Sequence, residues 1–474
     1  MAQAPGEGAE VTPMSTKQVA FMMAALLVAV MTTQLSATML APAIREIETK
    51  LGTGSFAAMS TYFYLAGAVA NVVLIRWSDF IGRKRMLGSV LAVACVGTAL
   101  CAVTTTLSLV LAGRFLQGVV NVTFGLTFLI LRERLSDKTF GLCAGIVTAV
   151  SGGTAGLDGL LGGYMSDHLG YRSIFMLIGV VGVVGVVLCV LAVPADDPER
   201  VAPGRMDWVG GALIAMGVAG VNLFFSSGTR SGWSSPLALG FIVAAIIALV
   251  ALVVVEKRTA RPLVNIGQLA SRQAWPLLVV ILLNMGSFMV VLGFIVPFIA
   301  EDLDSGFGHN GLTTALLFLT PAAILQLITA PLAGRIAVRI GFVTLLRIGQ
   351  IGALTATSLL AIFSHNQVLV AVFVALLGLT YLGIAGTAIS VLGVTQAPAD
   401  EPGSLPGIAN ASFGIGASLG YTWAGFIVGS GTYSSFQLSL WICVGAGAFG
   451  LAASLLLRPR TKSTATNPPV PQHG

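Results

Sequence analysis

Residues 55–106 decide the fold: SFAAMSTYFYLAGAVANVVLI (Ser55 to Ile75), RWSDFIGRKR (Arg76 to Arg85) and MLGSVLAVACVGTALCAVTTT (Met86 to Thr106). Two apolar runs of 21 residues flank a short segment that holds four basic residues. A helix needs about 20 apolar residues to cross the hydrocarbon core of a bilayer. This stretch therefore predicts two membrane-spanning helices joined by a charged turn.

The rest of the chain repeats this pattern. Only 9% of the 474 residues are charged, against about 25% in soluble chains, while 56% are hydrophobic and the mean hydropathy is +0.92. This composition excludes a soluble enzyme, a disordered protein and a secreted disulfide scaffold. Fourteen apolar runs are long enough to span a membrane: Gln18 to Ala41, Ser55 to Ile75, Met86 to Thr106, Leu107 to Leu131, Thr139 to Gly163, Tyr171 to Val193, Trp208 to Ser226, Ser235 to Val255, Gln273 to Ala300, Gly311 to Gly334, Phe342 to Phe363, Gln367 to Gly393, Pro406 to Gly429 and Ser434 to Leu457.

The basic residues predict the orientation. With fourteen spans, 20 of the 25 Lys and Arg residues lie in segments on the same side as the N-terminus. The opposite loops hold only Arg45, Lys50, Arg172 and Arg230, and Arg114 lies inside a span. Cytoplasmic loops are enriched in Lys and Arg, so both termini are expected in the cytoplasm and the protein in the plasma (inner) membrane.

The spans group as six, two and six. Secondary transporters are often built from duplicated six-helix halves with the substrate site between them. We therefore expect an all-α fold of two six-helix bundles and an insert of two helices. The predicted division is 1–17 (disordered tail), 18–193 (first bundle), 194–272 (linker with the two extra helices), 273–457 (second bundle) and 458–474 (disordered tail).

Two formal charges lie well inside predicted spans, Arg114 in the fourth and Asp158 in the fifth. Charges there are costly and mark functional sites by default. Counting from the outer helix ends puts Arg114 about 10 Å deep and Asp158 about 8 Å deep, so the sequence predicts that they pair. Such a pair either switches with protonation and couples proton movement to transport, or is a static ion pair that fixes helix packing.

Further polar and aromatic residues inside the spans are candidates to line a substrate cavity. In the fourth span, Arg114, Gln117 and Asn121 recur at helical spacing with glycines, which predicts a stripe facing protein or a cavity. Interhelical hydrogen bonds are the alternative role for each polar candidate, and ordinary packing is the alternative for the aromatic one. The full set of cavity candidates is Gln34, Ser36, Thr38, Gln117, Asn121, Asn284, Phe288, Gln326, Tyr381 and Asn410.

The sequence lacks the residue patterns that are typical of enzyme active sites and cofactor-binding sites. The five cysteines all lie in apolar runs without metal-ligand spacing, and no nucleophile triad or phosphate-binding loop occurs. The basic residues form no patch suited to nucleic acid. We therefore expect no enzymatic activity, no cofactor, no bound metal and no nucleic-acid partner. The expected partners are a small organic substrate, protons and the lipid bilayer, with the proton gradient as energy source.

The segment Asp79-Phe80-Ile81-Gly82-Arg83-Lys84-Arg85 resembles the D-x-x-G-R-[RK]-x signature of the major facilitator superfamily, although Ile75 replaces the family's usual preceding glycine. The resemblance implies that Asp79, Gly82 and Arg83 gate the cytoplasmic side. Arg114 to Gly118 is similar to the family's R-x-x-Q-G motif, whose arginine is implicated in proton coupling.

Other segments resemble the 14-helix drug:proton antiporters within that superfamily. The insert carries Asp207-Trp208-Val209-Gly210 and Gly232-Trp233-Ser234, and the second half carries Gly407-Ile408-Ala409-Asn410. The antiporter G-P-x-x-G-G motif is altered, since Asp158-Gly159 precede Gly162 and Gly163. The acid of the first-helix L-D-x-T motif is Ser36 here. We hypothesise that Asp158 has taken over this acid's role.

These features predict a proton-coupled secondary transporter that works by alternating access as a monomer. The resemblance favours export of small amphipathic compounds such as antibiotics. The alternative is proton-coupled uptake of a small metabolite, which the same fold permits.

Overall fold

The structure is a computed structural model that describes residues 14–196, 206–259, 266–396, 404–429 and 431–458. Within these ranges the chain is helical and contains no strand. Thirteen helical segments are long and apolar enough to cross a membrane, and the helix α7 (Asp137–Leu169), 33 residues long, contains the predicted span Thr139 to Gly163. The predicted all-α polytopic fold is confirmed. Most of the two predicted tails lies outside the described residues, and α1 already begins at Thr16.

The first half runs from α1 to α8. Its fourth predicted span consists of two α-helices joined by a short 3-10 turn, and a short helix follows the first span. The elements are α1 (Thr16–Thr38), η1 (Ala41–Ala43), α2 (Ile44–Leu51), α3 (Ser55–Ile81), α4 (Arg83–Val103), α5 (Leu107–Gly118), η2 (Val119–Asn121), α6 (Val122–Arg134), α7 and α8 (Tyr171–Ala192).

The second half runs from α12 to α21, and three of its spans contain π-helical turns. Such turns are rare in proteins, and those that occur are often found at functional sites. The elements are α12 (Trp275–Gly286), α13 (Phe288–Val290), η4 (Val291–Ile295), α14 (Val296–Glu301), α15 (Gly311–Thr314), η5 (Ala315–Leu319), α16 (Thr320–Ile340), α17 (Phe342–Ile362), α18 (Gln367–Leu377), η6 (Gly378–Ala385), α19 (Gly386–Thr395), α20 (Ser404–Val428) and α21 (Tyr433–Leu456).

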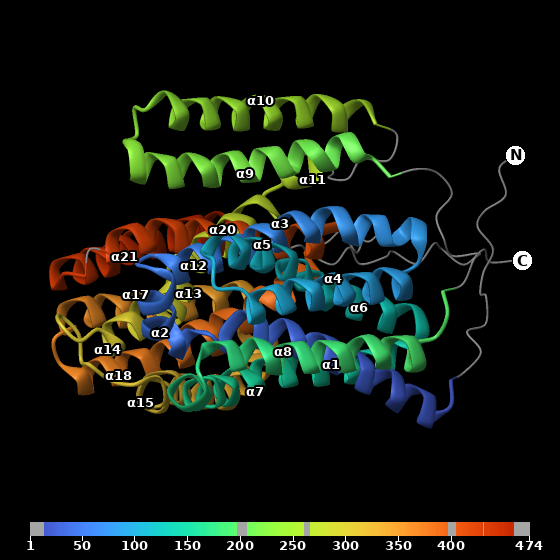
Figure 1. The fold of residues 1–474 in the computed structure, drawn as a ribbon. Helices are drawn as coiled ribbons and strands as arrows, with labels where there is room; N and C mark the ends of the chain where they lie inside the picture. Colours follow the sequence, from blue (N-terminus) through green and yellow to red (C-terminus); the bar gives the residue numbers. More distant parts are fainter. Residues whose placement is uncertain (1–13, 197–205, 260–265, 397–403, 430, 459–474) are drawn as a thin grey trace, which may run out of the picture.

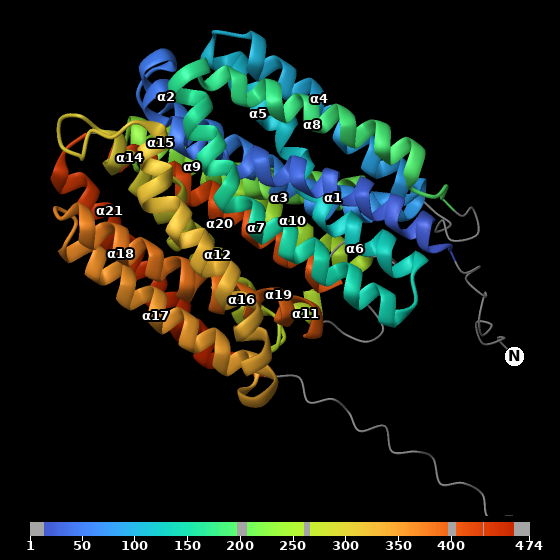
Figure 2. The ribbon, with the colours of Figure 1, turned by 90° about the horizontal axis from the view of Figure 1, so that it is seen from below.

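The two halves lie side by side as separate bundles (Figure 2), and the insert covers one flank of them (Figure 1). The insert consists of α9 (Trp208–Ser231), α10 (Pro236–Arg258) and the short α11 (Ile266–Leu269). We call the junction between the halves the seam. The most extensive contact across the seam is between α3 and α20, and α7 also packs against α15 and α16.

The molecule has two distinct ends (Figure 1). We call the end where α1 and α4 begin the near end, and the end that holds α2, α14 and α15 the far end. Glycines with positive φ make two tight turns at the near end, Gly82 between α3 and α4 and Gly341 between α16 and α17. These turns occupy matching places in the two halves, since each joins the second helix of its half to the third.

Candidate functional site

Arg114 lies on α5, where the helix packs against α3 and α4, and its side chain is only 2% exposed. Its guanidinium donates to the carbonyl oxygens of Ser36 on α1 (3.0 Å) and Met59 on α3 (3.3 Å), and to the side-chain oxygen of Gln117 (2.5 Å). The ring of Phe63 lies 4.3 Å from the guanidinium carbon. Arg114 thus ties together three helices of the first half through neutral acceptors and one aromatic face.

Asp158 lies on α7 and is 3% exposed. One carboxylate oxygen, Oδ2, lies within hydrogen-bond distance of the Thr38 hydroxyl of α1, and it shares the single proton of that hydroxyl with the carbonyl oxygen of Gln34. The other oxygen, Oδ1, has no hydrogen-bond partner among the described residues. A buried carboxylate with an open acceptor is costly unless a proton, a ligand or a water completes it.

The predicted pairing of Arg114 with Asp158 is wrong in this conformation, since no ion pair joins these two described residues. Both groups reach α1, Arg114 at the Ser36 carbonyl and Asp158 at the Thr38 side chain. Arg114 binds a backbone carbonyl of α1 and Asp158 binds a side chain of α1, so each charge is held by this helix through its own contact. Counting residues along a span fixes depth but leaves the direction around the helix open.

Two of the predicted cavity residues make hydrogen bonds within their own half. Gln117 donates to Thr98 of α4 (2.9 Å), and Asn284 accepts from Gln350 of α17 (3.4 Å). Ser36 is also internal, because its hydroxyl donates to the carbonyl oxygen of Thr32 (2.7 Å). The contacts of Gln117 and Asn284 agree with the interhelical alternative, whereas the Ser36 hydroxyl binds within its own helix α1.

Four further predicted residues have different surroundings, and one of them, Asn410, contacts the other half. Asn410 of α20 approaches α6 across the seam, within 3.9 Å of the position that a Cβ would take at Gly125. Gln326 of α16 has a buried side-chain oxygen without a partner among the described residues. Gln34 accepts from Ser151 of α7 at 3.3 Å, and Asn121 lies against Gly67 of α3.

Aromatic side chains fill the middle of the molecule. The predicted residues Phe288 and Tyr381 pack together in the second half, with ring centroids 5.4 Å apart, and the Tyr381 hydroxyl contacts the Met285 sulfur. The sequence analysis missed Tyr64 of α3 and Tyr421 of α20, whose rings stack across the seam at 5.6 Å. Both tyrosines lie within apolar runs, where nothing in the sequence distinguishes them from aromatic residues that only fill the core.

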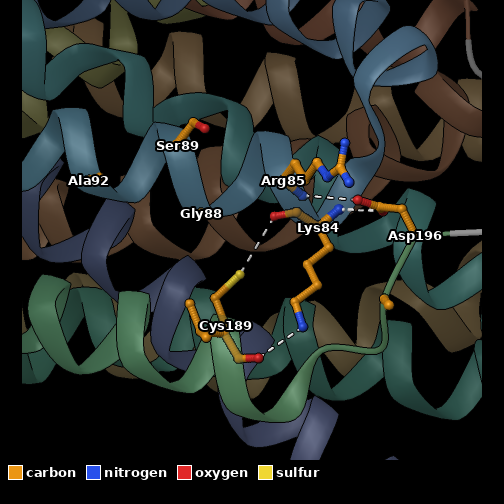
Figure 3. Close-up of a pocket in the computed structure, with 9 residues that line it drawn as sticks. Lys84, Arg85, Gly88, Ser89, Ala92, Cys189 and Asp196 are labelled. Carbon is orange, nitrogen blue, oxygen red and sulfur yellow. Dashed lines mark hydrogen bonds between the residues drawn. The ribbon is translucent and has the colours of Figure 1, made fainter.

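The gating motif predicted by resemblance lies at the near end, where its hydrogen bonds and ion pairs to described residues stay within the first half. Asp79 accepts from Arg76 (2.9 Å) and Arg83 (3.2 Å), and Arg83 also pairs with Glu133 at the end of α6 (2.7 Å). Asp196, which follows α8, accepts from the backbone N–H groups of Lys84 (2.8 Å) and Arg85 (3.2 Å), as Figure 3 shows.

Figure 3 also shows that Lys84 reaches across to the end of α8. Its ammonium donates to the carbonyl oxygens of Val190 (2.8 Å) and Val193 (2.6 Å). These are C-terminal helix carbonyls without intrahelical donors, which a cation stabilises. The near end of the first half is therefore tied together as one rigid unit.

The far end holds two acids that sequence reasoning assigned to loops. Glu301 at the end of α14 is 2% exposed, and its Oε2 accepts from the backbone N–H of Arg45 on α2 (3.0 Å). Asp167 on α7 accepts from the backbone N–H groups of Gly311 (3.0 Å) and Leu312 (2.9 Å). Both sets of hydrogen bonds cross the seam. Within the described residues, no cluster of His, Cys, Asp or Glu is placed to hold a metal ion.

Comparison with known proteins agrees with this architecture. A uridine/deoxyuridine transporter of Lactococcus lactis subsp. cremoris is 32% identical over 419 residues, which is 84% of this chain and 85% of that protein. Multidrug resistance protein 3 of Bacillus subtilis is 24% identical over 336 residues, 70% of this chain and 64% of that protein.

Among solved structures, the nucleoside transporter NupG superposes with a TM-score of 0.61 over 93% of this chain and 99% of that one, at 12% identity, which shows a shared fold. The sequence model of the Major Facilitator Superfamily matches residues 26–421 and again 277–472. With two helical bundles, a seam between them and matching turns at the near end, the chain belongs to the Major Facilitator Superfamily of membrane transporters.

Proposed function

We propose that this chain takes up a pyrimidine nucleoside or a closely similar small polar metabolite, driven by protons. The relative named for uridine and deoxyuridine transport is 32% identical and aligned over most of both chains, whereas the relative named for multidrug resistance is 24% identical. This difference favours the uptake alternative of the sequence analysis over drug export, which was its leading prediction.

The observation that carries the proposal is the presence of buried acceptor oxygens without partners. Among the described residues, Asp158 Oδ1 on α7 and Gln326 Oε1 on α16 are buried and have no hydrogen-bond partner. The helices that carry them, α7 and α16, pack against each other across the seam. A nucleoside carries several O–H and N–H donors, which satisfy such oxygens. A mainly apolar drug leaves them unpaired at a cost of about 1–3 kcal/mol each.

Asp158 is the proposed proton carrier. As a carboxylate it accepts the Thr38 hydroxyl and holds α7 to α1. A proton on its free oxygen removes the charge and turns that atom into a donor, so the protonated and ionised forms favour different partners. Proton binding shifts the balance between the two transport states only by its difference in affinity for them. Arg114 keeps a positive charge beside the backbone of α1 at Ser36.

The proposed topology follows from the distribution of Lys and Arg. Both termini and the near end face the cytoplasm, the far end faces outward, and the protein lies in the plasma membrane. Because one chain holds both halves of the transport unit, a monomer suffices. The contacts at the far end then belong to a state that is closed to the outside.

The test uses purified protein in proteoliposomes with labelled uridine. With an inward proton gradient we expect uridine to accumulate above its external concentration. Asp158→Asn should abolish this accumulation and retain exchange of labelled for unlabelled uridine, whereas the exposed-acid control Asp304→Asn should behave like the wild type. Replacement of Gln326 by Met should raise the KM for uridine about tenfold, because it removes one acceptor.

Drug export is the second candidate, favoured by the insert that resembles those of 14-helix antiporters and by the multidrug relatives. The same vesicles, loaded with a pH gradient and challenged with lipophilic cations, decide between the two. If such cations dissipate the gradient in the wild type while uridine neither accumulates nor exchanges, the nucleoside proposal is wrong.

A further inference from the structure

The far end contains a pair of contacts that cross the seam in opposite directions. Glu301 belongs to the second half and binds the backbone of α2 in the first half, at Arg45. Asp167 belongs to the first half and binds the backbone of α15 in the second half, at Gly311 and Leu312. In each case an acidic side chain accepts N–H groups in the first turn of a helix, where the helix itself offers no acceptor.

The backbones also meet closely at this place. A Cβ at Gly311 would lie 2.1 Å from the carbonyl oxygen of Pro42, and a Cβ at Gly163 would lie 2.6 Å from that of Gly311. Real Cβ atoms do not approach so closely, so these glycines are what allow α7, η1 and α15 to touch. The two acids thus bind across an interface at which the helix backbones are in direct contact, with no room for a side chain between them.

We propose that Glu301 and Asp167 form a reciprocal latch that sets the equilibrium between the closed and open forms of the far end. The latch goes beyond the proposed substrate and does not depend on it, because the groups involved are acids and backbone N–H groups of the protein itself. It engages only when the halves meet at the far end, and it must break each time that end opens.

The two arms differ in strength. Glu301 is 2% exposed and therefore binds in a poorly solvated place, whereas Asp167 is exposed and its hydrogen bonds compete with water. Glu301 Oε1 has no partner within the described residues, so among them this side chain binds one N–H group, which belongs to the other half. Hydrogen bonds to charged groups are stronger than neutral ones and gain strength away from water.

A small pocket of about 300 Å³ lies beside the latch and is lined by both halves, including Arg45, Lys50, Glu46 and His309. Glu46 is already bound to Lys50 (2.5 Å) and to the backbone N–H of Tyr171 (2.5 Å), both in the first half. Glu301 and Asp167 are thus the acids of this pocket whose hydrogen bonds cross the seam. The pocket gives water a path to the latch when it opens.

The experiment measures distances between spin labels on the full-length protein in lipid nanodiscs. One pair reports the far end, with labels at the exposed positions Thr49 and Leu303, and the other reports the near end, at Ser136 and Val338. These positions place one label on each half at each end.

For Glu301→Ala we expect the ratio of far-end-open to far-end-closed molecules to rise about tenfold, and for Asp167→Ala about threefold, with a larger change in the double variant. Glu301→Gln keeps an acceptor for the Arg45 N–H and should lie nearer the wild type. The control, Asp304→Ala, removes an exposed acid from the same segment and should leave both distances unchanged.

Loss of the latch is distinguished from general damage by the second label pair. A latch predicts that far-end distances lengthen while near-end distances shorten, because the halves rock as rigid bodies. The proposal is overturned if the double variant gives the same far-end distances as Asp304→Ala, or if both label pairs merely broaden together. Neither outcome depends on uridine transport, so failure of the latch and failure of the proposed function are separate results.

Discussion

The two ends of the molecule use acidic side chains in different ways. At the near end, Asp79 and Asp196 bind partners within the first half, so the bundle there is held together internally. At the far end, Glu301 and Asp167 bind across the seam. Contacts within a half survive when the halves move apart, whereas contacts across the seam must break. This difference accords with the proposed latch, in which the far end is the closed gate and the near end is the frame that holds the first half together.

The largest effect is expected from a side chain placed where the backbones meet. Gly311→Ala puts a Cβ against the Pro42 carbonyl oxygen, which is backbone and cannot move away cheaply. Overpacking of this kind costs about 1–3 kcal/mol, so substrate exchange in proteoliposomes should fall about tenfold or more and the far-end distance should lengthen. Gly445→Ala, in α21 with open space around it, should transport normally. Unchanged exchange in Gly311→Ala would mean that closure at the far end is not required.

At the near end the matching turns of the two halves provide an internal control. Gly82 and Gly341 have φ values of 97° and 86°, which other residues rarely adopt, so alanine at either should destabilise the protein by about 1–3 kcal/mol. A Cβ at Gly82 would also meet Asp196 Oδ2 at 2.2 Å, whereas a Cβ at Gly341 meets nothing within 4 Å. Thermal unfolding in detergent should therefore show a larger loss for Gly82→Ala. Equal losses would assign the whole effect to φ, and a changed far-end distance would contradict the proposed rigid frame.

A smaller effect is expected from the acid that holds this turn. Asp196→Ala removes the acceptor for two backbone N–H groups at the start of α4. Losing such a cap costs about 1 kcal/mol, so the melting temperature should fall slightly while the ratio of far-end-open to far-end-closed molecules stays constant. The spin-label pairs described above check the second part. A shift in that ratio as large as the one for Glu301→Ala would remove the distinction between the two ends.

The smallest effect is expected at a contact between α3 and α20. The Thr61 hydroxyl of α3 lies 3.1 Å from the Thr422 hydroxyl and 3.4 Å from the Ser418 carbonyl oxygen, both on α20, so its neutral hydrogen bond crosses between the halves. Thr61→Val keeps the shape and removes the bond, which should favour the separated form by about twofold to fivefold. Thr357→Val, which removes a hydroxyl that binds only within α17, is the matched control. Equal far-end distances in the two variants would show that this bond does not add to the latch.

Much of the architecture was predictable because hydrophobic length and Lys/Arg placement act on the whole chain. The spans and the charged turn at Asp79 to Arg85 appear where the sequence places them. Glu301 and Asp167 were missed for a physical reason. Both lie at the last residues of spans, where an acid usually faces water, and only the approach of the other half makes them crossing contacts.

The predicted pairing of Arg114 with Asp158 was wrong because a residue's position in a span indicates its depth in the membrane more clearly than the direction in which its side chain points. Ser36 does lie at the level of Arg114, as its carbonyl hydrogen bond shows. However, which face of α1 each charge approaches depends on how three helices pack together. The π-helical turns of the second half were equally hidden, since they arise from local insertions into the hydrogen-bond ladder and leave apolar periodicity almost unchanged.

The insert makes the two flanks of the seam different. Helix α9 packs on both α3 and α20, with Ile214 near Val72 and Ile408, and the rings of Trp77 and Trp208 are 5.0 Å apart. Among the described residues its contacts lie on this flank, while α7 and α16 form the other. Among the described residues, the insert thus adds a layer of helices over the junction on the α3–α20 flank, and the α7–α16 flank has no such layer.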